Sequence, residues 1–120
     1  MPNINAALLV AQMEQLDKFI ENKRELAKRY EEFFNGFDDI DFIQEPKESC
    51  SNYWLQAVLL KDKDARDNFL TYTNENGIMT RPIWTLMNEL DMFKNAQCVD
   101  LSNAKYFEQR VVNIPSSVVL

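Results

Sequence analysis

The segment from Asn3 to Met13 is apolar on nearly every side of the helix that its sequence predicts. It reads Asn-Ile-Asn-Ala-Ala-Leu-Leu-Val-Ala-Gln-Met and contains no charged residue. A helix on the surface of its own domain shows one apolar stripe, whereas a helix that is apolar all round is buried all round. A chain of 120 residues can hardly wrap such a segment at its end. We therefore expect Leu8, Leu9, Val10 and Met13 to be covered by protein outside this chain.

The pattern then changes to that of an ordinary amphipathic helix. Apolar positions recur at helical spacing and charged residues fill the other face. We expect one continuous helix over residues 3–34, a rod of roughly 45 Å at 1.5 Å per residue. Asn3 or Asn5 is expected to cap its start, and Asn35-Gly36 to supply a left-handed stop.

Strands and helices alternate after this long helix. We expect strands at 41–44, 53–60, 78–84 and 111–114, and helices at 64–76, around 86–93 and at 103–110. The strand at 53–60 is apolar enough to be central. Pro82 suits an edge strand or a strand end. The sequence predicts a single α+β domain, in which a long N-terminal helix accompanies a small, largely antiparallel sheet of three or four strands covered by helices on one face.

Apolar residues and capping residues mark the faces and ends of the two later helices. Phe69, Leu70 and Tyr72 are expected to face the core, and Gly77 to follow the helix end. Ser102 or Asn103 is expected to cap the last helix.

Composition and charge narrow the possible functions. Apolar residues make up 46% of the chain, which is enough for a folded core. A net charge of −6 offers no cluster of cations for nucleic acid. No run is as long as a transmembrane helix and no leader precedes the first helix, so we expect a cytoplasmic protein without a membrane partner. Cys50 and Cys98 lack any flanking pattern and are interpreted as reduced thiols.

Missing residue types remove whole classes of chemistry. The chain has no histidine, which excludes Ser-His-Asp and Cys-His catalysis and, with two cysteines, argues against a zinc site. Its two glycines cannot form a glycine-rich phosphate loop. The acidic clusters Asp38-Asp39-Asp41 and Asp62-Asp64 are interpreted as solvated loops and helix caps rather than acid/base pairs. We expect no catalytic residue and no metal site in this chain.

Four sequence segments occur in an order that is typical of one enzyme family. They are Pro-Asn-Ile-Asn-Ala-Ala at 2–7, Ser-Asn-Tyr-Trp-Leu at 51–55, Gly-Ile-Met-Thr-Arg-Pro-Ile-Trp at 77–84 and Val-Asn-Ile-Pro-Ser-Ser at 112–117. Together they resemble the C-terminal small domain of the DegT/DnrJ/EryC1/StrS sugar aminotransferases. The resemblance is strongest to the branch that aminates UDP-linked 4-keto-6-deoxy sugars on the way to legionaminic acid. Asn88 departs from it, since many relatives have histidine there.

The resemblance implies a homodimeric enzyme that uses pyridoxal 5′-phosphate bound in a larger, preceding domain. The lysine that forms the Schiff base belongs to that domain, which would also cover the apolar helix. Met1 falls where the family has the last residue of Asn-Tyr-Arg-Met, so we expect the large domain to be absent and the 120 residues to bind no cofactor. Lys61 and Lys63 sit among aspartates and do not look like substitutes.

Within the small domain, the resemblance implies a role in placing the substrate. Arg81 could bind the diphosphate of a nucleotide sugar or the carboxylate of the amino donor, and Trp84 could offer an indole face. Alternatively, Arg81 pairs with a surface acid and Trp84 packs in the core. Ser51 and Asn52 could hydrogen-bond a sugar hydroxyl or simply form a turn.

Two neighbours of these residues, Tyr53 and Trp54, are expected to pack in the core rather than to bind substrate. Two functions remain open for the chain. One is the small domain of an aminotransferase that is expected to move an amino group from glutamate onto a keto-deoxy sugar for cell-surface polysaccharide. The other is a free-standing binding or regulatory module that dimerises through the apolar helix.

Overall fold

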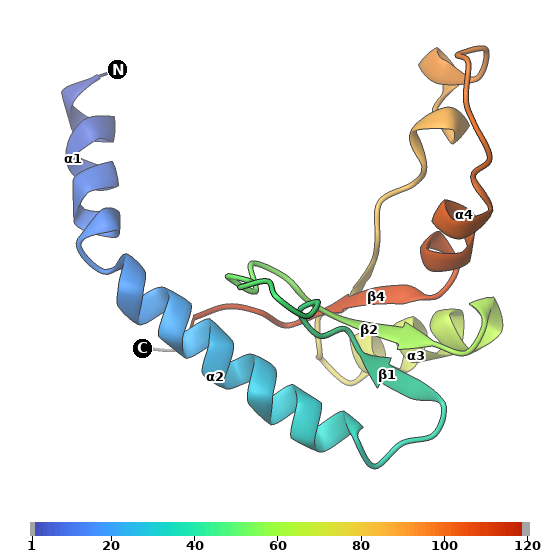
Figure 1. Cartoon of the computed structure of the whole chain (residues 1–120), viewed down its shortest axis with the longest axis horizontal. Helices are drawn as coiled ribbons and strands as arrows, with labels where there is room; N and C mark the ends of the chain where they lie inside the picture. The colour runs from blue at the N-terminus through green and yellow to red at the C-terminus, as the bar shows by residue number, and fades with distance from the viewer. Residues whose placement is uncertain (1, 119–120) are drawn as a thin grey trace.

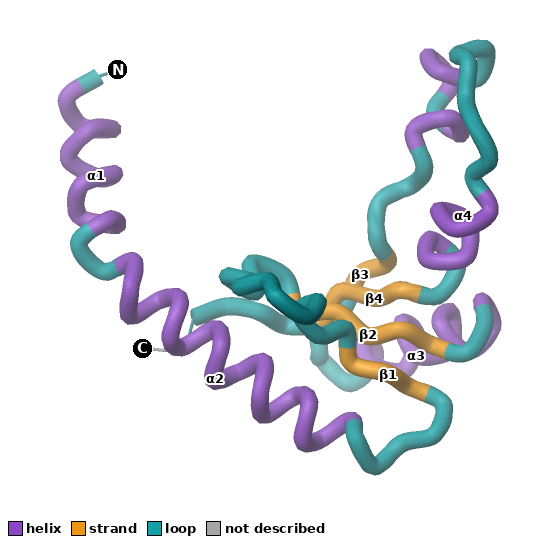
Figure 2. The backbone as a smooth tube through the Cα atoms, in the orientation of Figure 1, coloured by secondary structure: helices purple, strands orange, loops and turns teal. Residues whose placement is uncertain are grey.

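The computed structural model describes residues 2–118 of the chain (Figure 1). Its elements, in order, are α1 (Asn3–Met13), α2 (Leu16–Phe34), β1 (Ile40–Phe42), β2 (Gln56–Leu60), α3 (Lys63–Glu75), β3 (Arg81–Pro82), the 3-10 turns η1 (Met87–Glu89) and η2 (Asp91–Phe93), α4 (Ser102–Glu108) and β4 (Val111–Ile114). Figure 2 separates these helices and strands by colour. The predicted α+β class is confirmed.

The four strands form one antiparallel sheet in the order β1-β2-β4-β3. β2 lies between β1 and β4, which confirms the central position expected for this apolar strand. β3 lies at the edge, where Pro82 costs the sheet no central hydrogen bond. The strands at 53–60 and 78–84 are shorter than expected, because pairing begins only at Gln56 and is limited to Arg81–Pro82.

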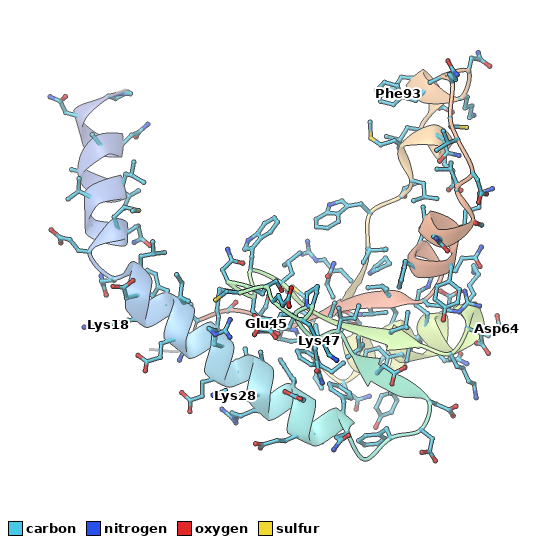
Figure 3. The ribbon with its side chains drawn as sticks, in the orientation of Figure 1. Lys18, Lys28, Glu45, Lys47, Asp64 and Phe93 are labelled. Atoms are coloured by element: carbon cyan, nitrogen blue, oxygen red, sulfur yellow. The ribbon has the colours of Figure 1, made fainter. Side chains whose placement is uncertain are left out.

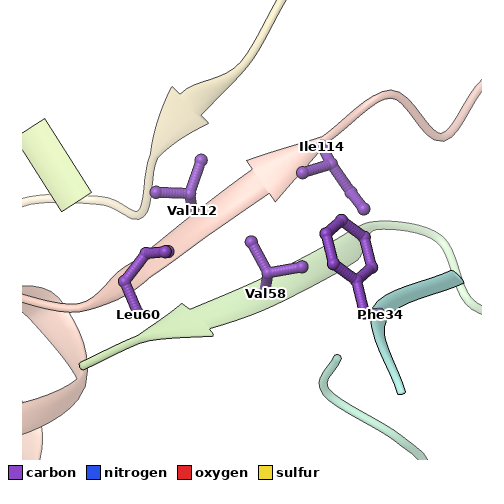
Figure 4. Close-up of a cluster of buried hydrophobic side chains, with 5 residues drawn as sticks. All are labelled: Phe34, Val58, Leu60, Val112 and Ile114. Atoms are coloured by element: carbon purple, nitrogen blue, oxygen red, sulfur yellow. The ribbon is translucent and has the colours of Figure 1, made fainter. Parts of the chain in front are cut away.

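The core lies on one face of this sheet. Val58 and Leu60 of β2 and Val112 and Ile114 of β4 point to this face, where Phe34 of α2 meets them (Figure 4). α2 and α3 both cover this face, the latter through Phe69 and Leu70. The expectation that helices cover one face is therefore correct. Tyr72, however, does not face the core, since 68% of its surface is exposed.

The expected long helix is interrupted at Glu14-Gln15. The Gln15 amide donates to the Gln12 carbonyl at 3.1 Å, three residues back, and Gln15 leaves the helical region at φ −111° and ψ 2°. Such a tightened turn changes the direction of a helix. The expected caps are also wrong, because Pro2 occupies the N-cap position without a side-chain bond and Asn35 is right-handed at the end of α2.

α1 extends away from the sheet (Figure 1) and has no buried residue. Leu8, Leu9, Val10 and Met13 are between 50% and 62% exposed. The described residues therefore leave this helix uncovered, as its all-round apolar pattern predicts.

The ends of α3 follow their predicted signals, whereas α4 does not. Asp62 caps α3 by accepting a hydrogen bond from the Ala65 amide at 2.8 Å, and Gly77 follows it at φ +78°. α4 begins after Leu101 without a side-chain cap. The Asp100 carboxylate accepts hydrogen bonds from Ser102 instead, so Ser102 is a donor and not a cap.

Candidate functional site

Arg81 lies on the sheet face opposite the core. It pairs with Asn113 of β4, which in turn pairs with Ala57 of β2, so the three residues form one row across the sheet. Cross-strand partners share a face, and the adjacent row, which contains Val58 and Val112, points into the core. We call the face that carries Ala57, Asn113 and Arg81 the second face of the sheet.

The guanidinium of Arg81 is exposed and makes no ion pair with a described carboxylate. Its Nη2 atom lies 3.7 Å from the sulfur of Met79, a weak acceptor. Pairing with a surface acid, the alternative raised for this residue, is thus not seen within residues 2–118. Asn113, half-buried on the same row, carries a side-chain amide that no described group engages.

Trp84 does not pack in the core. It follows Ile83, whose amide donates to the Val111 carbonyl at 3.4 Å as the last contact of the edge strand. The indole is 69% exposed. Arg81 and Trp84 therefore both face solvent from the same edge of the sheet.

Ser51 and Asn52 hold the loop that leads into β2. The Ser51 hydroxyl accepts a hydrogen bond from the Tyr53 amide, and the Asn52 side-chain oxygen accepts one from the Trp54 amide, each at 3.0 Å. These are the short-range bonds of turn-forming residues. The turn-forming alternative is present in the structure, while binding of a sugar by either residue stays a prediction.

An ion pair that the sequence did not reveal fixes the same loop to α2. Arg24 donates to Glu45 twice, from Nη2 to Oε1 at 2.8 Å and from Nη1 to Oε2 at 3.0 Å. Arg24 Nη1 also donates to the Ser51 carbonyl at 2.6 Å, and the Ser51 amide donates to Glu45 Oε2 at 2.7 Å. Figure 3 shows Glu45 beside the ribbon of α2. These bonds, Arg24 first and then Ser51, lower the pKa of the Glu45 carboxyl to about 2.

Tyr53 completes this arrangement. Its φ of +46° is unusual for an aromatic residue, and three contacts stabilise it. The Glu45 amide donates to its hydroxyl at 3.2 Å, its ring stacks on Phe42 at 6.4 Å, and the Arg24 guanidinium lies 5.7 Å from the ring centre. Tyr53 thus packs on Phe42, a residue that lies against the core, without entering the buried core itself.

The expected core packing is wrong for Trp54, which is 67% exposed. Both polar groups of its backbone are hydrogen-bonded. The Trp54 amide donates to the Asn52 side chain, and the Trp54 carbonyl accepts from Lys23 Nζ at 3.1 Å. These bonds fix the main chain in a turn that leaves the indole outside.

The two sets of predicted site residues lie toward the same end of the sheet without meeting. The loop enters β2 at Gln56, which pairs with Ile114, and the Arg81 row is the next one along. Within residues 2–118, no hydrogen bond joins Ser51 or Asn52 to Arg81 or Trp84.

Lys23 is the lysine whose setting comes nearest to that of a Schiff-base lysine. Burial lowers the pKa of Lys23, which is the direction that a Schiff-base lysine needs. Its ammonium, however, donates to the carbonyls of Trp54 and Ser116 and ties two loops to α2. Other lysines pair with aspartates, as Lys61 does with Asp39 at 3.2 Å. We derive no step of cofactor chemistry from this chain.

Metal ligands, membrane-spanning helices and cysteines were the remaining features of interest in residues 2–118. They contain no group of three or more acidic or sulfur ligands that could hold a metal ion. None of their helices is both long and apolar enough to cross a membrane. Cys50 and Cys98 are free and exposed, as expected.

Known proteins resemble this chain in both sequence and fold. It is 31% identical to a GDP-perosamine synthase of Vibrio cholerae in an alignment 121 positions long, which covers 97% of this chain and 32% of the relative. A GDP-perosamine synthase of Escherichia coli O157:H7 is 31% identical over 78% of this chain and 25% of its own length. The chain thus spans about a third or less of these relatives.

Solved structures share the fold at lower identity. The Helicobacter pylori aminotransferase PseC, described as involved in the biosynthesis of pseudoaminic acid, matches with a TM-score of 0.84 at 16% identity, over 93% of this chain and 31% of that one. The sugar aminotransferase Spr1654 of Streptococcus pneumoniae also reaches 0.84, at 20% identity, over 97% and 31% of the two chains. The family model of the DegT/DnrJ/EryC1/StrS aminotransferases matches residues 1–120. The chain belongs to the DegT/DnrJ/EryC1/StrS aminotransferase family.

Proposed function

We propose that this chain works as the C-terminal small domain of a nucleotide-sugar aminotransferase, a cytoplasmic homodimer that depends on pyridoxal 5′-phosphate. The enzyme moves an amino group, taken from glutamate, onto a keto-deoxy sugar used for cell-surface polysaccharide. The family match and the perosamine synthases among the relatives support an amino-sugar product. The legionaminic-acid branch stays a prediction. When bound in the large domain, the cofactor supplies the electron sink for transamination.

The exposed guanidinium of Arg81 is the observation that carries this proposal. A guanidinium binds phosphate or carboxylate as a planar fork, and Arg81 engages no described acid. In the proposed enzyme, Arg81 binds the diphosphate of the sugar nucleotide or the carboxylate of the donor. Trp84 places an exposed indole near the same strand edge, where it can stack on a base or sugar ring.

The role of the loop at Ser51 and Asn52 is to present hydrogen-bonding groups in a fixed place. Arg24 and Glu45 hold its backbone, which reduces the ordering cost of binding. Asn52 uses its side-chain oxygen within the turn, so its amide nitrogen is the group that remains for a sugar hydroxyl.

The size of the native polypeptide tests the proposal directly. Antibodies against the 120 residues should detect, in cells that contain this sequence, a protein about three times as heavy as the 14.1 kDa chain. Mass spectrometry of that protein should find a lysine-bearing domain ahead of residue 1. A native product of 14 kDa alone would reject the small-domain assignment.

A cofactor assay on the purified chain is a second test. Mixed with pyridoxal phosphate and treated with borohydride, the 120-residue chain should show no stoichiometric lysine adduct. A specific adduct would contradict the assignment of cofactor binding to another domain.

The second candidate is a free-standing module that dimerises through α1. The exposure of Leu8, Leu9 and Val10 favours it, because an uncovered apolar helix suits a partner as well as it suits a large domain. A native product of 14 kDa would support this function.

A further inference from the structure

Asn113 is a polar residue in the middle of the second face of the sheet. It lies on β4 between Val112 and Ile114, whose side chains belong to the buried core (Figure 4). Because successive side chains of a strand point to opposite faces, the Asn113 side chain points away from that core. β4 has a neighbouring strand on each side, β2 and β3. Asn113 therefore lies on an inner strand and not at the edge of the sheet.

The residues around Asn113 on the two inner strands are apolar. The register places Ala57 opposite Asn113 and Leu59 opposite Val111, the next residue of β4 on this face. Val111 is only 5% exposed, whereas Asn113 is half-buried. The Asn113 amide thus lies where the covered part of this face meets the open part, beside the small side chain of Ala57. Asparagine is depleted in strands, so strand propensity does not account for it.

The Asn113 carboxamide has no hydrogen-bond partner within residues 2–118. Three other asparagines differ, since Asn52, Asn74 and Asn76 each bond a backbone group a few residues away. A carboxamide offers two N–H donors and an accepting oxygen. On Asn113, all of them remain available to a molecule that enters from solution.

Arg81 is the direct cross-strand neighbour of Asn113. Side chains opposite each other in an antiparallel pair have Cβ atoms about 4.5–5.5 Å apart, so one small group can contact both. An acidic residue opposite Arg81 would neutralise the guanidinium, but this position holds an uncharged amide. The pair thus combines one positive charge with further donors and one acceptor.

This combination fits an oxyanion that has a hydrogen-bond donor beside it. The guanidinium of Arg81 binds the oxyanion as a planar fork. The Asn113 nitrogen adds a donor to the same oxyanion, while the Asn113 oxygen accepts from the neighbouring O–H or N–H group. Two ligands of the proposed reaction have this pattern. In a sugar nucleotide, a hydroxyl on carbon 2 lies beside the phosphate on the anomeric carbon. In glutamate, the α-amino group lies beside the α-carboxylate.

We propose that Asn113 and Arg81 bind one ligand together, and that Asn113 recognises the donor group beside the oxyanion that Arg81 holds. This inference rests on the proposed function of Arg81 and adds a residue that determines specificity. An arginine alone binds any oxyanion within reach. Asn113 adds the requirement for a neighbouring donor, because a ligand without one leaves the amide oxygen unpaired.

NMR of the nitrogen-15-labelled chain tests this site directly. The side-chain NH2 signals of Asn113 are identified by their loss in Asn113→Ala. UDP-glucose and L-glutamate are titrated separately, and one of them should shift these signals to saturation, which identifies the source of the oxyanion. UDP-2-deoxy-2-fluoroglucose and glutarate lack the donor group of the respective ligand. The matching analogue should bind about three- to tenfold more weakly, as expected for the loss of one hydrogen bond.

Variants separate the two residues. The dissociation constant is followed at the backbone amide of Ile83, which every variant retains. Asn113→Ala should raise it about tenfold for the ligand and remove the preference over the analogue, because a hydrogen bond to a charged group is lost with the selective one. Arg81→Ala should weaken the ligand and its analogue by the same factor.

Two further variants serve as controls. Asn113→Leu keeps the size of the side chain and should bind like Asn113→Ala, with urea denaturation confirming that both are folded. Asn95→Ala, at an exposed asparagine after η2, should bind like wild type. No saturable shift with either ligand, or an unchanged dissociation constant in Asn113→Ala, would overturn the inference. Binding that needs Arg81 but not Asn113 would reject this inference alone, and the size of the native polypeptide tests the proposed function separately.

Discussion

Arg24 and Glu45, 21 positions apart, form a two-pronged ion pair between α2 and the loop before β2. Both partners also bond to the backbone of Ser51, one to its carbonyl and one to its amide. One charged pair thus fixes the main chain of a loop that has no regular secondary structure. The consequence is that residues 51–54 keep a defined geometry next to the sheet.

Replacing Arg24 with Ala should therefore loosen the loop without unfolding the domain. Lys47 lies in this loop (Figure 3), so the rate at which trypsin cleaves after Lys47 reports on its opening. We expect Arg24→Ala to raise that rate several-fold, measured by mass spectrometry of the peptides. Lys61→Ala removes an exposed pair with Asp39 and should leave cleavage at Lys47 unchanged. An equal effect of both variants would show that the Arg24 pair has no special role.

The same pair predicts how the loop responds to acid. The pKa of Glu45 is lowered from its ordinary value of 4.5 to about 2 in the folded chain. A lowered carboxyl pKa stabilises the fold above pH 4.5, and the stabilisation is lost as the pH falls through about 2. Carbon-13 NMR of the Glu45 carboxyl should show a midpoint near 2. In Arg24→Ala the midpoint should rise toward 4.5, and an unshifted midpoint would contradict the assigned cause.

The hydrophobic pattern predicted the positions of the main strands but not all of their ends. The pattern correctly identified β2 as central and Val111–Ile114 as β4. It extended the first of these strands back to Tyr53, whereas pairing begins at Gln56. The reason is local, because Ser51 and Asn52 bond to the next amides and hold the backbone in turns. Apolar residues within such turns look like strand residues in the sequence.

The interruption between α1 and α2 could not be predicted from periodicity. Residues around Glu14 and Gln15 are ordinary helix formers, and the break is seen only in the structure, where the Gln15 amide bonds to Gln12. The exposure of α1 within the described residues was predictable from its uncharged, all-round apolar pattern.

The candidate site was only partly visible in the sequence. The motif at 77–84 pointed to Arg81 and Trp84, but it left open whether Trp84 packs in the core, and only the structure shows that the indole is exposed. Arg24 and Glu45 carried no signal, since each looks like one more charge in a polar segment and their partnership is long-range. Asn113 became a site neighbour only through strand register, which the sequence does not fix.

The cap of α3 gives a prediction about stability. Asp62 accepts a hydrogen bond from the Ala65 amide at the start of this helix. Asp62→Ala should lower the free energy of unfolding by about 0.5–2 kcal/mol, measured by urea denaturation. Asp62→Asn keeps an accepting oxygen and should restore most of the loss. If Asn were as destabilising as Ala, the charge of Asp62 rather than its hydrogen bond would be responsible.

Arg81 and Trp84 give the prediction that bears on the proposed function. With Trp54→Phe, Trp84 is the only tryptophan left, so its fluorescence reports on ligands at the strand edge. GDP or UDP should quench this fluorescence if the diphosphate binds Arg81 and the base or ribose reaches the indole.

Variants of Arg81 test whether the guanidinium binds the nucleotide. Arg81→Ala in this background should raise the dissociation constant of the nucleotide at least about tenfold, because a charge-assisted hydrogen bond contributes about 1.5–3 kcal/mol. Arg81→Lys should recover part of the affinity, since lysine keeps the charge without the planar fork. Arg29→Ala, which removes an arginine on the opposite side of the sheet, serves as the control. Quenching of the same strength with and without Arg81 would show that the nucleotide does not bind through this guanidinium.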